Sequence, residues 1–168
     1  MSDGTVYIFL DVDGVLNKSS QWKRMFQLDD ECIACFARYA KHISPKSSPK
    51  VVLTSTWENG FKYDGKHSSP VMDLVSRLRV HGIAVIGKTE PNDSENRSKE
   101  INQYIDQHGL KSSRCIVVDD DKRLFQSKLA SNAELFLVDA ATGFTEHDID
   151  RKKSKGTSWF GRLLGRHA

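Results

Sequence analysis

The stretch at residues 7–17, YIFLDVDGVLN, constrains the fold of this chain more than any other. An apolar run that suits a buried strand ends in two aspartates, Asp11 and Asp13, and Gly14 follows at once. Burying an unpaired carboxylate costs free energy, so acids in this position need a cation, a hydrogen-bonding partner or water. We therefore expect a buried strand whose carboxyl end carries a site that binds a cation and supports chemistry.

Short apolar runs alternate with helical patterns along the chain, which is typical of a parallel α/β sheet. The pattern predicts strands at 5–10, 50–53, 83–86, 115–118 and 135–138. It predicts helices at 28–43 and 94–108, and another that Ser69 caps and Gly82 ends. The 168 residues are enough to bury a proper core, and we place a single domain at residues 1–150.

Three of the predicted strands end in side chains that carry oxygen: Asp11 and Asp13 after the first, Thr54 and Ser55 after the second, and Asp119, Asp120 and Asp121 after the fourth. Ligands bind at the carboxyl ends of the strands in open parallel sheets, so these side chains should meet in one crevice. Hard oxygen ligands in this number, with no His or Cys nearby in sequence, favour Mg²⁺ over Zn²⁺. The three consecutive aspartates leave the register of the metal ligands open by one residue.

The end of the chain, residues 151–168, differs in charge from the rest. It holds six basic residues and no acid, so the net charge of +3 for the whole chain becomes about −3 for residues 1–150. Apolar side chains recur at helical spacing among these cations: Trp159, Phe160, Leu163 and Leu164. This basic amphipathic tail could lie on a membrane surface, pair with RNA, dock on a partner protein or pack on the domain.

The sequence predicts a cytoplasmic protein without a transmembrane segment. No apolar stretch approaches the length that spans a membrane, and the first residues, MSDGT, do not form a secretory signal. The three cysteines, Cys32, Cys35 and Cys115, make no disulfide framework and suit a reducing compartment.

The motifs at the strand ends resemble those of the haloacid dehalogenase-like (HAD) phosphohydrolases: DVDGV after an apolar strand, Thr-Ser after the second, a basic residue opening a later helix, and an acid pair after another strand. More narrowly, LDVDGVLN, VVLTSTW, the Arg97-x-x-Glu100-Ile101 run, VVDDD and LVDAATGFT are similar to the HAD domain of RNA-repair proteins of the Swiss army knife group. The resemblance covers residues 5–145 and implies a three-layer, Rossmann-like parallel sheet. The segments 17–27 and 58–68 are too short for a full cap domain, so we expect little or no cap.

The resemblance implies a role for each acid. Asp11 matches the nucleophile that becomes an aspartyl-phosphate. Asp13 matches the acid and base that protonates the leaving oxygen and then activates water, and its main-chain carbonyl is expected to bind the metal. Asp119 and Asp120 match the acids that complete the Mg²⁺ site. Members that break carbon–halogen bonds lack an aspartate in the place of Asp13, so the reaction implied is hydrolysis of a phosphate ester.

The resemblance also implies a hydroxyl and a cation that hold the phosphate. Thr54 matches the hydroxyl, with Ser55 as a second candidate. Arg97 and Lys99 compete for the place of the cation, and we prefer Arg97 because it lies nearer the amino end of its helix. Lys88 is a third candidate.

An active site without a cap is open, which favours large substrates such as nucleic-acid ends or phosphoproteins. Basic and aromatic residues after the first strand could engage a nucleic-acid backbone and a base: Trp22, Lys23, Arg24 and Phe26. The sequence, together with the resemblance, therefore predicts a phosphatase of polynucleotide ends, 3′ or 5′, of RNA or DNA. A kinase or ligase, the usual partner domain, is not found in this sequence, and a partner chain could supply it. A phosphatase of small metabolites or nucleotides and a non-catalytic module that binds nucleic acid or protein are the alternatives.

Overall fold

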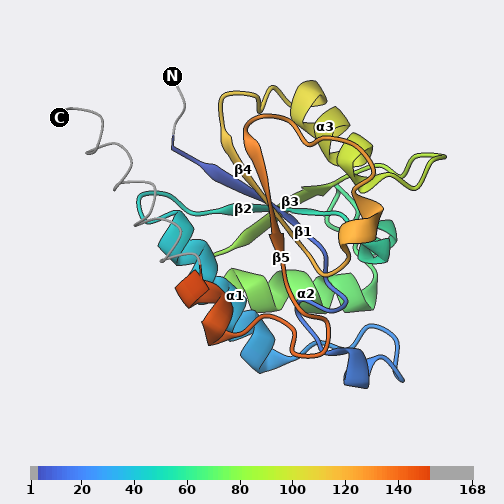
Figure 1. Cartoon of the computed structure of the whole chain (residues 1–168). Helices are drawn as coiled ribbons and strands as arrows, with labels where there is room; N and C mark the ends of the chain where they lie inside the picture. Colours follow the sequence, from blue (N-terminus) through green and yellow to red (C-terminus); the bar gives the residue numbers. More distant parts are fainter. Residues whose placement is uncertain (1–3, 152–168) are drawn as a thin grey trace.

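A single parallel sheet forms the centre of the molecule in the computed structural model, which describes residues 4–151. Its strands are β1 (Val6–Leu10), β2 (Lys50–Leu53), β3 (Ala84–Lys88), β4 (Arg114–Asp119) and β5 (Ala133–Leu137), in the order β3-β2-β1-β4-β5. The helices α1 (Asp30–Ile43), α2 (Ser69–Val80) and α3 (Arg97–Gln107) cover the sheet (Figure 1). The predicted three-layer α/β fold is confirmed. Of the predicted tail, only Arg151 lies within the described residues.

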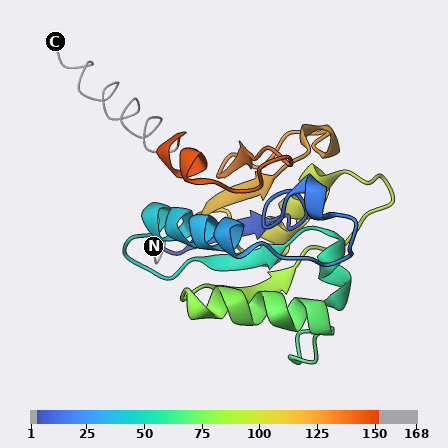
Figure 2. The same ribbon diagram turned by 90° about the horizontal axis from the view of Figure 1, so that it is seen from below.

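The alternation of side chains along the strands gives the sheet two apolar faces. In β1, Ile8 and Leu10 pack into the larger core cluster with residues of α1 and α2, while Phe9 joins the smaller cluster under α3. The Phe9 ring meets the Tyr104 ring of α3 edge to face, with 5.6 Å between centroids. Figures 1 and 2 show α1 and α2 on one face of the sheet and α3 on the other. Each fully buried side chain of this size contributes about 1.5–3 kcal/mol to folding.

The order of the strands places a topological switch point between β1 and β4. The chain runs outward from β1 through β2 to β3, and α3 then carries it back to β4 on the other side of β1. Crevices that bind ligands form where two neighbouring strands lead away in opposite directions. The residues that follow β1 and β4 are therefore well placed to form a site.

Short segments, and no inserted domain, surround this edge of the sheet in the described part of the chain. A turn of 3₁₀ helix, η1 (Ser19–Gln21), lies in the loop after β1, and a second, η2 (Thr56–Gly60), follows β2. A third, η3 (Lys122–Leu124), follows β4. Within residues 4–151 no helix is long and apolar enough to cross a membrane.

All three helices begin at other residues than the sequence predicts. α1 begins at Asp30 and not at residue 28, because the Asp29 side chain caps it by accepting hydrogen bonds from the backbone of Glu31 and Cys32. Ser68, not Ser69, is the N-cap residue of α2, and Ser69 and Pro70 form its first turn. The helix α3 begins at Arg97 and not at residue 94, because the side chain of Asn92 accepts hydrogen bonds from the backbone of Ser94 and Asn96 and holds a turn there. Asn96 then caps α3 by accepting from the backbone of Ser98. This places Arg97 at the first helical position.

Candidate active site

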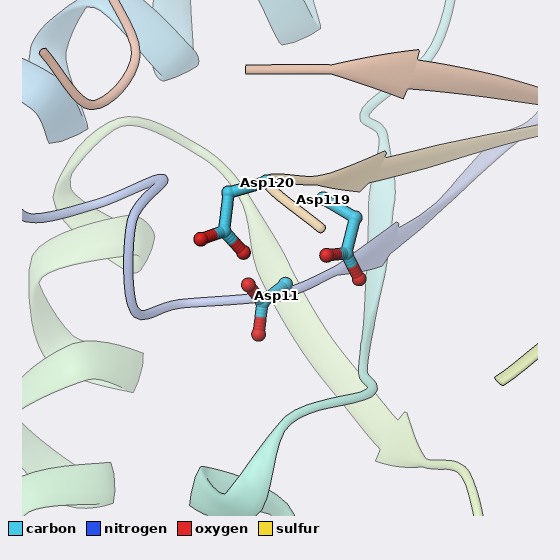
Figure 3. A group of neighbouring side chains, drawn as sticks. All are labelled: Asp11, Asp119 and Asp120. Atoms are coloured by element: carbon cyan, nitrogen blue, oxygen red, sulfur yellow. The ribbon is translucent and has the colours of Figure 1, made fainter. Parts of the chain in front are cut away.

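Three carboxylates meet at the switch point. Asp11 follows β1, Asp119 ends β4, and Asp120 comes next. One oxygen from each lies within 4.8 Å of the others, and Figure 3 shows the three side chains turned toward one another. The backbone N–H of Asp11 donates to the carbonyl of Val118 (3.0 Å), which continues the β1–β4 pairing beyond the strand and fixes Asp11 beside β4. Asp11, Asp119 and Asp120 therefore lie together, as expected from their places after β1 and β4.

The charges of these carboxylates are poorly compensated by the protein. Asp11 is 5% exposed and Asp119 is fully buried. Burial, together with the neighbouring Asp119 and Asp120, raises the pKa of Asp11 well above its ordinary value. Burial also raises the pKa of Asp119, although Arg97 opposes that shift. One guanidinium cannot balance three carboxylates, so the cluster suits a divalent cation.

The donor atoms of the cluster fit Mg²⁺. All of them are carboxylate oxygens, and no His or Cys belongs to the group found among the described residues. Hard oxygen ligands of this kind are what Mg²⁺ binds, usually with water completing the coordination. Asp11, Asp119 and Asp120 are therefore the side chains that would hold the ion.

Gly14 allows the chain to pass close to this cluster. Its φ angle is +81°, in the left-handed region that favours glycine. A Cβ atom at this position would also overlap the carboxylate of Asp120. Its backbone N–H donates to Asn17 Oδ1 (2.8 Å), which closes the turn after Asp13. The glycine of the DVDGV motif is thus required by both conformation and space.

The side chain of Asp13 lies outside the group of three carboxylates. Its two oxygens accept hydrogen bonds from Asn17 Nδ2 (2.9 Å) and from the indole nitrogen of Trp57 (3.2 Å). These donors hold one orientation of a carboxylate that is otherwise half-exposed. Sequence reasoning did not predict either contact. Asn17 belongs to the same motif and could have been noticed, but Trp57 lies 44 residues away in sequence and offers no comparable signal.

The structure separates the two hydroxyl candidates. Thr54 follows β2, and its backbone N–H donates to the carbonyl of Leu10 (3.1 Å). Its buried Oγ1 has no hydrogen-bond partner among the described residues, although buried hydroxyls normally have one. Ser55 Oγ instead accepts from the backbone of Trp57 (3.3 Å) as the cap of η2. Thr54 is therefore the hydroxyl that remains available to an incoming oxygen.

Of the three candidate cations, the structure brings Arg97 to the carboxylates. Arg97 Nη1 lies 2.5 Å from Asp119 Oδ2 and 3.6 Å from Asp11 Oδ1. Although burial lowers the pKa of Arg97, the charges of Asp119 and Asp11 more than offset this and raise it. Lys99 lies in the same first turn of α3 but is exposed, and Lys88 lies at the end of β3.

Asp121 turns away from the cluster. Its carboxylate accepts two hydrogen bonds from the Arg123 guanidinium, both 2.9 Å long, and a third from the backbone of the same residue. It caps η3 by this last bond. Asp119 and Asp120 are therefore the members of the acidic run that reach the site.

Glu58 is a buried acid beside the site that sequence reasoning missed. Its side chain accepts a hydrogen bond from Thr89 Oγ1 (3.2 Å). Burial, together with the charge of Glu100, raises its pKa to about 7, although the bond from Thr89 and the charge of Arg97 oppose the shift. The folded state thus favours the neutral acid.

We expect Glu58 to make the stability of the protein depend on pH. Because the pKa of Glu58 is raised in the folded state, the protonated side chain stabilises the fold. This stabilisation is fully present below the ordinary pKa of 4.5 and is lost as the pH rises through about 7. In the wild type, the free energy of unfolding should therefore fall by up to about 3 kcal/mol as the pH rises from 4.5 to about 7. The Glu58→Gln variant should lack this decrease. Denaturant unfolding at pH 5 and pH 8 measures it, with Glu90→Gln, an exposed acid, as control. An equal pH dependence in wild type and Glu58→Gln would contradict the expectation.

The comparisons with known proteins agree with this geometry. The family model of the HAD domain in Swiss Army Knife RNA repair proteins matches residues 7–149. Apart from Val6 at the start of β1, this range includes every strand, the acidic cluster and Arg97. No curated protein and no solved structure gives a significant match. The chain therefore belongs to the family of HAD domains found in Swiss Army Knife RNA repair proteins.

Proposed function

We propose that this protein is a Mg²⁺-dependent phosphatase that acts through an aspartyl-phosphate, on an accessible phosphate ester such as a polynucleotide end. Membership of the family points to phosphatase or hydrolase activity of the HAD type. The observation that carries the proposal is the cluster of Asp11, Asp119 and Asp120 with Arg97 beside it, at the switch point of a parallel sheet. A carboxylate nucleophile needs neighbouring positive charge before a phosphate dianion can approach it.

In the proposed reaction, a carboxylate oxygen of Asp11 attacks phosphorus. The bond from phosphorus to the leaving oxygen breaks while Asp13 transfers a proton to that oxygen. Water then attacks the aspartyl-phosphate, and Asp13 takes the proton that the water gives up. The bond between phosphorus and Asp11 breaks, which releases inorganic phosphate and restores the Asp11 carboxylate and the protonated Asp13 side chain.

The other residues bind and orient the phosphate. Thr54 Oγ1, which lacks a partner in the described structure, can donate to a phosphoryl oxygen, and Arg97 can balance the charge on that group. Asn17 and Trp57 hold the Asp13 carboxylate in place. The carboxylates of the cluster would hold Mg²⁺, which when bound offsets negative charge on the transferring phosphoryl group.

The substrate class rests on two observations. The described chain has no inserted cap over the carboxylates, so the site can admit the end of a large molecule. The family is one of domains in RNA repair proteins, where polynucleotide ends are the natural substrates to consider.

The experiment that tests the proposal measures phosphate release. The substrates are an aryl phosphate and oligonucleotides of RNA and DNA with a 3′- or a 5′-phosphate, each with Mg²⁺ or with a chelator. We expect release that requires Mg²⁺ and favours oligonucleotide ends. Preference for free nucleotides would support the alternative of a small-molecule phosphatase. Release from none of these substrates would contradict the proposal and favour a binding module.

We expect the two candidate cations on α3 to differ strongly in this assay. Arg97→Gln should lower kcat/KM by about 10²- to 10³-fold, because it removes the positive charge beside the nucleophile. Lys99→Gln should stay within about threefold of wild type, because its exposed side chain contacts no reacting group. A larger loss in Lys99→Gln than in Arg97→Gln would assign the role to the lysine instead.

A further inference from the structure

A hollow of about 800 Å³ opens beside Asp13. The loop after β1 forms one wall with Trp22, Arg24, Met25 and Phe26, and η2 and the start of α2 form the other with Trp57 and Val71, among others. None of the three clustered carboxylates, Arg97 or Thr54 lines it. The hollow therefore adjoins the proposed acid and none of the groups proposed to hold the phosphate.

The walls of the hollow suit a flat aromatic group. Trp22 is 46% exposed, Met25 81% and Phe26 43%, an unusual concentration of large apolar side chains in one loop. The Phe26 ring lies edge to face against Trp57, with 5.1 Å between centroids. Aromatic side chains that are exposed in this way stack on nucleobases with little regard to sequence.

The charge of the same loop suits a polyanion. Residues 18–28 include Lys18, Lys23 and Arg24 and no acid, although residues 1–150 together carry a net charge of about −3. Lys18 pairs with Asp29 (3.7 Å), so Lys23 and Arg24 are the cations that a polyanion would meet. Arg24 lines the hollow itself. Cations next to an aromatic surface match a base together with the phosphodiester that follows it.

Hydrogen bonds within the protein fix the conformation of the loop after β1, so the loop does not need a ligand to order it. Asn17 Nδ2 donates both to Asp13 Oδ1 (2.9 Å) and to the carbonyl of Gln27 (2.8 Å). Trp22 Nε1 donates to Asn17 Oδ1 (2.9 Å). Phe26 has a φ angle of +58°, which a bulky residue rarely adopts and which persists only when the surroundings impose it. One buried asparagine thus joins the wall of the hollow to the proposed acid.

We propose that this hollow holds the base of the nucleotide that bears the phosphate to be removed. The inference rests on the proposed function and makes it more specific. The ribose oxygen that leaves phosphorus receives its proton from Asp13, the base enters the hollow and packs against the exposed side chains of Met25 and Phe26, and the next phosphodiester lies near Arg24.

The test compares two substrates that differ only in the base. One is an oligonucleotide whose phosphorylated terminal residue carries its base, and the other has an abasic residue at that position. Both are prepared with 3′- and with 5′-phosphates. We expect wild-type protein to prefer the first by about 10- to 100-fold in kcat/KM, the range that stacking of one base supplies.

Variants locate the preference in the hollow. Phe26→Gly removes the ring at a position whose positive φ glycine tolerates, and Met25→Ala shortens an exposed side chain of the same wall. Both should reduce the ratio of the two rates, Phe26→Gly to near one. Met72→Ala removes a side chain of the same type, 48% exposed on α2 outside the hollow, and should keep the ratio of the wild type.

The outcomes separate the inference from the proposed function. Equal turnover of the two oligonucleotides by wild-type protein would overturn the inference and leave the phosphatase standing. An undiminished ratio in both Phe26→Gly and Met25→Ala would do the same. Preference for a phosphotyrosine peptide over every oligonucleotide would also overturn it. No release from either oligonucleotide or from an aryl phosphate would overturn the proposed function, and the inference with it.

Discussion

Asp11→Asn is expected to lower the rate of phosphate release by at least about 10³-fold, because an amide cannot serve as the nucleophile in the proposed reaction. The same change should leave the metal-free protein at least as stable as wild type. Asp11 is buried beside Asp119 and Asp120, and these surroundings already raise the pKa of its carboxyl well above the ordinary value. A neutral side chain of the same shape removes that repulsion.

The two effects are measured on the same preparations. Steady-state phosphate release gives the first, and thermal or denaturant unfolding in the presence of chelator gives the second. Asp106→Asn is the matched control, since Asp106 forms only an exposed ion pair with Lys111 at the far end of α3. If Asp11→Asn retained substantial activity while the control behaved like wild type, Asp11 would not be the nucleophile. An inactive variant that is also unfolded would not support the assignment.

Mg²⁺ should stabilise the wild-type fold, and Asp120→Asn should lose most of that effect while Asp121→Asn keeps it. An ion at a hundred times its dissociation constant adds about 2.7 kcal/mol to the free energy of unfolding. For a chain of this size that corresponds to an increase of roughly 5–10 °C in Tm. The two aspartates are neighbours in sequence, but Asp120 belongs to the acidic cluster and Asp121 binds Arg123.

Thermal unfolding with increasing Mg²⁺, and again with chelator, measures this difference without any substrate. Asp120 suits the comparison better than Asp119, because Asp119 also forms the ion pair with Arg97. The Mg²⁺ dependence of phosphate release should weaken in the same variant. Equal shifts of Tm in Asp120→Asn and Asp121→Asn would exclude the cluster as the metal site.

The parts of the fold that sequence predicted best are those that depend on local patterns. The strand at β2 has the predicted bounds, and β1 begins one residue later than expected. The placement of Asp11, Asp119 and Asp120 at one edge of the sheet followed from a general property of parallel sheets, but their close approach also requires β1 and β4 to be neighbours in the strand order. The start of α3 was predicted three residues too early, because the turn formed by Asn92 competes with the helix.

The parts that sequence did not predict depend on contacts between distant residues. Asp13 shares the spacing of a metal ligand with Asp11, yet its carboxylate turns to Asn17 and Trp57. Which of Thr54 and Ser55 can bind the phosphate depends on which hydroxyl caps η2. That becomes visible only in the folded turn after β2. Glu58 carries no local sign of a raised pKa, since its burial arises only when Thr89 and its neighbours close around it.

The pairing of β1 with β4 has a consequence for the assembly of the molecule. In the described sheet this ladder joins the first three strands to the last two, and Asp11 and Asp119 approach across it from distant parts of the chain. Closing so long a loop costs conformational entropy, and like charges at its end oppose the closure. A cation bound at that point would act as a cross-link between the two halves of the sheet. Removing the ion should therefore weaken the pairing of β1 with β4 before it affects the packing inside either half of the sheet.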